Sequence, residues 1–189
     1  EVDVTPRPGT GRSGLSGQLG DVSQESARAA YTYARANAAN WGIDPYFYRK
    51  TDLHVHIPEG AIPKEGPSAG IAMATARISA LSGNPVRGDV AMTGEITLHG
   101  NVLPIGGIKE KSIAAHREGM QTSILPAANR SMARKEIPQT VQDACKISYA
   151  KTLSEVLQTA LTQKPHPYKA KEEGKETGEG KEPLLPGGN

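Results

Sequence analysis

The sequence is poor in aromatic residues and contains a single cysteine. Aromatic residues make up 4% of the 189 residues, and Cys145 is the one cysteine. A lone cysteine forms no internal disulfide, so a secreted disulfide scaffold is excluded and a reducing compartment is expected. The hydrophobic core must therefore consist of Ala, Val, Ile, Leu and Met, with close backbone approach at small residues.

Long hydrophobic runs and an excess of one charge are also missing. The longest apolar run, residues 70–76, is far shorter than the roughly 18 residues that a transmembrane helix needs. The formal net charge of +2 argues against nucleic acid as the main partner, because phosphate binding needs a concentrated basic surface. No Cys/His group has the spacing of a zinc site. Since the chain opens on Glu1 without a leader, we expect a domain excised from a longer protein.

Composition divides the chain into a folded part and a tail. Residues 164–189 contain five Lys, five Glu, four Pro and five Gly, with almost no aliphatic residues. Such a segment buries too little apolar surface to offset the entropy of ordering, so we expect it to be a disordered charged tail. Residues 1–163 are expected to form a single domain.

The hydrophobic pattern predicts a compact α/β (α+β) domain with short mixed strands and packed helices. Apolar residues repeating every three or four positions predict a helix that begins near Asp21 and ends at Gly42. Small residues all round the helical wheel predict a buried helix over residues 67–81, starting at Ser68. Residues 6–20 are expected to form a Gly/Ser-rich loop. Strands are expected at residues 2–5, 53–57, 90–93, 96–98, 102–105, 123–125 and 146–149, and further helices at 108–118, 131–136 and 153–161.

Two glycine-rich segments have the letters of phosphate-binding loops. Residues 9–14 (GTGRSG) match a dinucleotide fingerprint, but another loop follows them instead of the helix on which a pyrophosphate would sit. Residues 106–112 (GGIKEKS) end in Lys-Ser, but Glu110 replaces the glycine that a phosphate loop has before its lysine. Nucleotide binding is therefore the weaker interpretation of both segments.

The strand predicted at residues 53–57 (LHVHI) carries two histidines. Strict alternation places its three aliphatic residues on one face and both His54 and His56 on the other. Two imidazoles without a third ligand are more typical of a polar lining than of a metal site.

Ser68 is the candidate nucleophile. Residues 63–70 are expected to form a turn that delivers its hydroxyl to the first turn of the buried helix, where free backbone N–H groups favour a developing oxyanion. The alternative is that Ser68 only caps the helix, which is the commoner role of a serine in this position.

Lys111 is the candidate base. At 100° per residue it falls on the buried stripe of helix 108–118 with Ala114 and Ala115, whereas Lys109 points away. Burial lowers the pKa of a lysine, and a lowered pKa lets the neutral amine act as a general base. The alternative is a surface lysine whose stem alone is buried.

Three segments around these residues resemble the proteolytic domain of the ATP-dependent Lon proteases. They are residues 58–70 (PEGAIPKEGPSAG), 92–96 (MTGEI) and 103–111 (LPIGGIKEK), within a resemblance that covers residues 14–161. The resemblance implies the Lon proteolytic-domain fold. It also implies a serine endopeptidase in which Ser68 attacks the scissile carbonyl and Lys111 takes its proton, by way of an acyl-enzyme.

The same resemblance implies supporting roles for four further residues. Thr93 should hydrogen-bond and orient the amine of Lys111. His54 and His56 match a pair of histidines that shape the polar floor of the family's site. Glu65 takes an acidic position, usually Asp in relatives, from which the acid can contact the lysine in a closed, inactive loop.

The chain departs from the family's pattern at a few positions. Arg77 stands where relatives tend to carry an aliphatic residue, and Ser23 stands where a larger apolar residue is common. The differences at Arg77 and Ser23 are expected to affect local packing or a subunit contact. The family pattern also has a strand before the position of Glu1, so we expect the N-terminal strand of the domain to be truncated in this sequence.

The resemblance also implies a biological setting. The domain would cleave unfolded or damaged polypeptides fed to it by an ATP-driven ring, and six copies would enclose a central chamber. The ATPase module that uses ATP and Mg is expected outside this chain, so the chain itself is expected to hold no cofactor and no metal. We expect a cytoplasmic protein, or a mitochondrial matrix protein in a eukaryote, with no membrane and no nucleic-acid partner.

Two other functions remain open. Lon-like domains also serve as non-proteolytic ring-forming scaffolds, although the joint presence of Ser68, Lys111 and Thr93 favours a peptidase. A phosphate- or nucleotide-binding protein would rest on the two glycine-rich segments.

Overall fold

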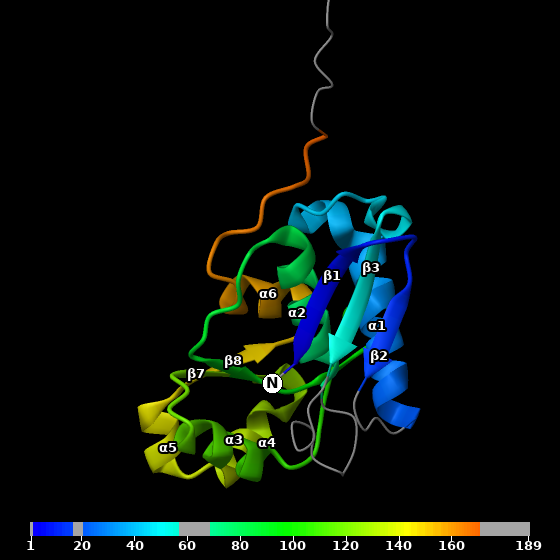
Figure 1. The fold of residues 1–189 in the computed structure, drawn as a ribbon. Helices are drawn as coiled ribbons and strands as arrows, with labels where there is room; N and C mark the ends of the chain where they lie inside the picture. The colour runs from blue at the N-terminus through cyan, green and yellow to red at the C-terminus, as the bar shows by residue number, and fades with distance from the viewer. Residues whose placement is uncertain (1, 17–20, 57–68, 171–189) are drawn as a thin grey trace, which may run out of the picture.

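The computed structural model describes residues 2–16, 21–56 and 69–170. These residues form an α/β domain with small sheets and packed helices, as the sequence predicts (Figure 1). The elements in chain order are β1 (Asp3–Pro8), β2 (Ser13–Ser16), α1 (Asp21–Asn37), the 3-10 helices η1 (Ala38–Trp41) and η2 (Phe47–Arg49), β3 (Thr51–His56), α2 (Gly70–Ser82), β4 (Val90–Met92), β5 (Glu95–Ile96), β6 (Val102–Leu103), α3 (Ile108–Arg117), β7 (Thr122–Pro126), the 3-10 helix η3 (Ala127–Asn129), α4 (Arg130–Glu136), α5 (Gln139–Ala144), β8 (Lys146–Ala150) and α6 (Leu153–Ala160).

The first sheet has the strand order β1-β3-β2. Strand β3 lies in the centre, antiparallel to β1 and parallel to β2. The predicted alternation is confirmed from residue 53 to residue 56, because Leu53 and Val55 are buried whereas His54 is half-buried and His56 is exposed; Ile57 lies outside the described residues. The inner face therefore contributes to the main core, and the outer face carries polar side chains.

The predicted loop at residues 6–20 is wrong in part. β1 continues through Pro8, and β2 occupies Ser13–Ser16. Two prolines are tolerated in β1 because it is an edge strand of the described sheet, where a missing N–H breaks no ladder. β2 has no hydrophobic pattern of its own and is defined by its pairing with β3, so the local sequence does not predict it.

The second sheet is parallel, with the order β4-β7-β8. All five residues of β7 are buried, and two neighbouring residues of the strand belong to different hydrophobic clusters. Ile124 joins the main core with α1, α2 and α6, whereas Leu125 joins a smaller cluster with residues of α3, α4 and α5. Figure 1 shows these last three helices gathered at one end of the molecule. Helices on both faces are the usual setting of a buried parallel strand.

Three details of the predicted helices differ from the structure. The helix expected to start at Ser68 begins at Gly70, and Ser68 itself lies outside the described residues. Ala114, expected on the buried stripe of α3, is exposed, whereas Ala115 is buried. The short helix α5 was not predicted, since its six residues are too few for a recognisable period.

The chain after α6 packs back on the body of the domain. The side chain of Asn84 donates to the carbonyl of Gln163 at 2.9 Å and accepts from its N–H at 3.1 Å. The N–H of Tyr168 donates to the carbonyl of Ala39 at 2.7 Å. Residues 164–170 thus run along η1 without regular secondary structure, and the rest of the predicted tail lies outside the described residues. None of the helices in the described ranges is both long and apolar enough to span a bilayer.

Arg77 is a cation in the interior. It lies on α2 with 1% of its surface exposed, and burial lowers its pKa to about 10. Its guanidinium donates to Oγ of Ser13 at 3.2 Å and lies 5.2 Å from the ring centroid of Tyr31. Among the described residues its Nε has no hydrogen-bond partner and no carboxylate forms an ion pair with it. A buried charge without a counter-charge costs free energy.

We expect the substitution Arg77→Met to raise the free energy of unfolding by about 1 kcal/mol, because it removes the buried charge and keeps most of the volume. Chemical denaturation monitored by circular dichroism measures the change. The control is Arg28→Met on the exposed face of α1, where we expect less than about 0.5 kcal/mol. A clear loss of stability in Arg77→Met would show that the buried charge of Arg77 does not destabilise the folded domain.

Candidate functional site

The segment that contains Thr93 connects the second sheet to the start of α2. The N–H of Thr93 donates to the carbonyl of Ile124 on β7 at 3.1 Å. One residue later, the carbonyl of Gly94 accepts from the N–H of Ile71 at 3.0 Å. The first N–H groups of a helix have no partner within the helix, so Gly94 satisfies one that α2 leaves open. This bond helps to explain why regular helix begins at Gly70 and fixes the position of the residues just after Ser68.

Glu95 extends the same connection to α1. Its Oε2 accepts from Oγ of Ser26 at 2.5 Å, and its Oε1 accepts from the N–H of Ile96 at 3.0 Å. Gly70 lies directly against this carboxylate and the Ile96 backbone. The absence of a Cβ at Gly70 therefore permits the close approach of α2 to β5.

Lys111 lies in the first turn of α3. The helix begins after Gly107, which has a φ of +72° and so adopts the left-handed conformation that favours glycine. Nζ of Lys111 donates to the carbonyl of Gly106 at 3.3 Å. Lys111 is half-buried and Lys109 is exposed, as the helical spacing predicts. Burial lowers the pKa of the Lys111 amine below its ordinary value.

The remaining predicted site residues lie in different places. Thr93 is buried, with 9% of its surface exposed. Ser68 and Glu65 lie outside the described residues, so the structure does not test the predicted contacts of either one. His54 and His56 lie on the outer face of the first sheet.

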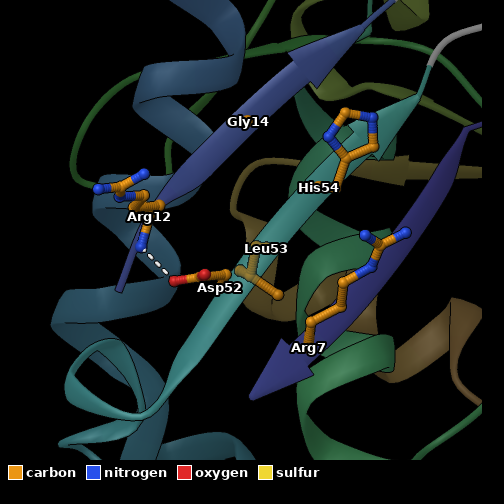
Figure 2. Close-up of a pocket in the computed structure, with 6 residues that line it drawn as sticks. All are labelled: Arg7, Arg12, Gly14, Asp52, Leu53 and His54. Carbon is orange, nitrogen blue, oxygen red and sulfur yellow. Dashed lines mark hydrogen bonds between the residues drawn. The ribbon is translucent and has the colours of Figure 1, made fainter. Parts of the chain in front are cut away.

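The outer face of the first sheet contains an open groove of about 280 Å³ (Figure 2). It is lined by Arg7, Arg12, Gly14, Asp52, Leu53 and His54. Figure 2 shows the side chains of Arg7 and Arg12 extending to opposite sides of β3, with His54 farther along the strand. Neither Thr93 nor Lys111 is among the described residues that line the groove, so it is separate from the candidate base.

The glycine-rich loop between β1 and β2 is organised by Asp52. One oxygen of this carboxylate accepts from the N–H groups of Thr10, Gly11 and Arg12 at 3.0, 2.9 and 2.7 Å. These backbone hydrogen bonds, the one from Arg12 foremost, hold the pKa of Asp52 below its usual range. The N–H groups that a phosphate would need are therefore already used by the protein, which argues against the dinucleotide interpretation. Within the described ranges, no three His, Cys, Asp or Glu side chains come together as a metal site would require.

The sequence did not predict the residues that hold two segments in place, namely the segment that contains Thr93 and the loop that precedes Lys111. Ser26 and Glu95 are 69 residues apart, and Asn129, which binds the backbone of Ile105, is 24 residues from its partner. Glu95 belongs to one of the segments that carry the resemblance, but no local pattern points to its partner. Asn129 lies four residues after the end of the predicted strand 123–125, and no local sequence pattern points to its contact with Ile105.

Comparison with known proteins identifies a family. Residues 1–163 match the family described as the Lon protease (S16) C-terminal proteolytic domain. The Lon protease of Brevibacillus choshinensis is 56% identical over 164 residues, which cover 87% of this chain and 21% of that protein. The Lon protease of Escherichia coli K12 has the same identity and coverage. That of Chloroflexus aggregans is 52% identical over 166 residues, or 88% of this chain and 20% of the relative.

The chain therefore spans about a fifth of the length of these relatives. The matched range includes all three segments on which the sequence resemblance rests.

The close approach at Gly70 gives a stability prediction. A Cβ added there would lie 2.9 Å from the backbone nitrogen of Ile96 and would overlap the Glu95 carboxylate. We expect Gly70→Ala to lower the free energy of unfolding by about 1–3 kcal/mol, measured by denaturant titration. Gly88→Ala is the control, because a Cβ there meets nothing within 4 Å. Equal stability of the two variants would disprove the tight contact.

Proposed function

The chain belongs to the Lon protease (S16) proteolytic-domain family, and from that premise we propose that it is a serine endopeptidase domain with a Ser68-Lys111 dyad. The observation that carries the proposal is the environment of the Lys111 side chain. Lys111 is half-buried, its amine donates to the carbonyl of Gly106 at 3.3 Å, and burial lowers the pKa of that amine. A lysine in this environment is neutral more often than an exposed one, and only the neutral amine can accept a proton.

The proposed reaction has two stages. The neutral amine of Lys111 takes the hydroxyl proton of Ser68 while the Ser68 oxygen bonds to the scissile carbonyl carbon. The ammonium then gives a proton to the leaving amine as the peptide C–N bond breaks, which leaves an ester on Ser68. A water, deprotonated by Lys111, attacks the ester, and the proton returns to the Ser68 oxygen as the acid product leaves. Backbone N–H groups near the start of α2 are suitable donors for the oxyanion of each tetrahedral intermediate.

The other predicted residues take supporting roles in this proposal. Thr93 would orient the Lys111 amine from its buried position on the segment that holds α2. His54 and His56 would contribute polar groups from the outer face of β3. Glu65 would regulate access by contacting Lys111 when the loop before Ser68 is closed. Each of these roles rests on the family resemblance.

We also propose the setting that the family implies. In the full-length protein, an ATP-driven module would unfold damaged polypeptides and deliver them to this domain, with ATP and Mg bound outside this chain. Six copies would form a ring in the cytoplasm. The relatives are named Lon proteases, and the matched part of this chain covers 20–21% of each of them.

Substitution of the dyad tests the proposed chemistry. Ser68→Ala and Lys111→Ala should each lower kcat for a fluorogenic peptide by at least about a thousandfold, because the nucleophile and its base act as a unit. Lys109→Ala is the matched control, since Lys109 lies on the same helix turn but is exposed. A peptide boronate should form an adduct at Ser68, detected by mass spectrometry, in the wild-type chain and not in Ser68→Ala.

Unchanged hydrolysis in both dyad variants would rule out the dyad. A wild-type chain that neither cleaves peptide nor forms the boronate adduct would instead favour the non-proteolytic scaffold.

The lowered pKa of Lys111 gives a pH prediction. Activity needs the neutral amine, so kcat/KM should rise with pH through the pKa of Lys111 and level off above it. Because burial lowers this pKa, the midpoint should lie below the ordinary lysine value of 10.5. The pH profile of peptide hydrolysis measures the midpoint, with Lys109→Ala as the control that should leave it in place. A profile that is flat over this range would show that Lys111 is not the base.

A further inference from the structure

Asn129 makes a two-point contact with the backbone of Ile105. Its Nδ2 donates to the carbonyl of Ile105 at 2.9 Å, and its Oδ1 accepts from the Ile105 N–H at 2.9 Å. The side chain is buried, with 4% of the residue exposed. An amide that both donates to and accepts from one residue fixes its orientation as well as its position.

Ile105 directly precedes two glycines that bind Lys111, one through its side-chain amine and one through its backbone N–H. The carbonyl of Gly106 accepts from Nζ of Lys111 at 3.3 Å, and the carbonyl of Gly107 accepts from the N–H of Lys111 at 3.0 Å. Neither glycine has a side chain that could fix the loop by packing, and glycine is the most flexible residue. The contact from Asn129 therefore limits the movement of the carbonyl to which the amine binds.

We propose that Asn129 is a positioning residue that holds the loop at residues 105–107 and thereby sets how deeply the Lys111 amine is buried. The inference rests on the proposed function, in which this amine is the base. When the two bonds of Asn129 are lost, the loop moves, Nζ becomes more hydrated than it already is, and the partial burial that lowers the pKa of Lys111 is reduced. The pKa then rises toward its ordinary value and fewer molecules carry a neutral amine at a given pH.

Among the described residues, charged neighbours do not explain the lowered pKa of Lys111. Burial is the cause that lowers its pKa. The charged side chains of α3 and of the two helices packed on it are all exposed; they are Lys109, Glu110, His116 and Arg117 of α3, Arg130, Arg134, Lys135 and Glu136 of α4, and Asp143 of α5. The hydration of the amine is therefore the property that Asn129 controls.

The chain contains a matched control in Asn84. Its amide makes the same two-point contact with a single backbone residue, donating to the carbonyl of Gln163 at 2.9 Å and accepting from its N–H at 3.1 Å. Asn84 is also buried, with 9% exposed, and its hydrogen bonds involve the end of α2 and the chain after α6. Loss of Asn84 should cost similar stability without reaching the loop of Lys111.

The experiment compares Asn129→Ser, Asn129→Ala and Asn84→Ser in the full chain. We expect a similar loss of thermal stability in the two serine variants. Only the Asn129 variants should lower kcat, by about ten- to a hundredfold with little change in KM, because a misplaced base weakens the chemical step more than substrate binding. The acid limb of their pH profile should move to higher pH.

A titration of the Lys111 side-chain nitrogen by NMR separates this proposal from the proposed function. The Lys111 pKa should rise in Asn129→Ser and stay at its wild-type value in Asn84→Ser. A rise without any change in kcat would uphold the role of Asn129 and show that Lys111 is not the base. An unchanged Lys111 pKa in Asn129→Ser would overturn the proposal.

One measurement needs no variant and covers the case in which the Asn129 variants fail to fold. The N–H of Ile105 should exchange with solvent slowly in the wild-type chain, because it is bound to a buried amide. Exchange as fast as that of an exposed loop N–H would overturn the proposal.

Discussion

The burial of strand β7 is the constraint on which the rest of the structure depends. All five of its residues are buried, so its backbone groups must find partners on both sides and at its end. Strands β4 and β8 supply the lateral partners, and the N–H of Thr93 binds the carbonyl of Ile124. The chain then turns through η3 to Asn129, which binds Ile105. The Thr93 segment and the Lys111 loop are thus attached near the same end of one strand.

Glycine residues allow these segments to be joined by backbone hydrogen bonds and close backbone contacts. The carbonyl of Gly94 accepts from an N–H in the first turn of α2, Gly70 lets that helix approach β5, and the carbonyl of Gly106 accepts from the amine of Lys111. The scarcity of aromatic residues limits the core to small and aliphatic side chains. It fits an architecture in which close backbone contacts position α2, the Thr93 segment and Lys111. A larger side chain at Gly70 would push apart the segments that the hydrogen bonds bring together.

The sequence predicted the features that depend on local pattern. The alternation along β3, the buried helix α2 and the inward position of Lys111 relative to Lys109 follow from periods of two or about 3.6 residues. β2, the start of α2 at Gly70 and the contact of Asn129 with Ile105 were not predicted, because each is set by a partner distant in the sequence. The resemblance predicts the chemistry of the candidate site. It does not predict the supporting contacts of Glu95 with Ser26 and of Asn129 with Ile105, because each joins residues that are distant in the sequence.

The two hydrophobic clusters on either side of β7 differ greatly in size. The smaller one has five buried residues among the described part of the chain, which are Ile108 of α3, Leu125 of β7, Ala133 of α4, Ile137 just after α4 and Val141 of α5. A unit with so little buried apolar surface opens at lower free energy than the main core and can do so as a cooperative unfolding unit of its own. Lys111 lies on α3, which contributes Ile108 to this smaller cluster. Gly70 and Thr93 lie next to the larger core, because Gly70 starts α2 and the N–H of Thr93 binds the carbonyl of Ile124. Lys111 and the start of α2 at Gly70 therefore belong to parts of the molecule with different local stability, and a partial unfolding event would separate them while most of the domain stayed folded.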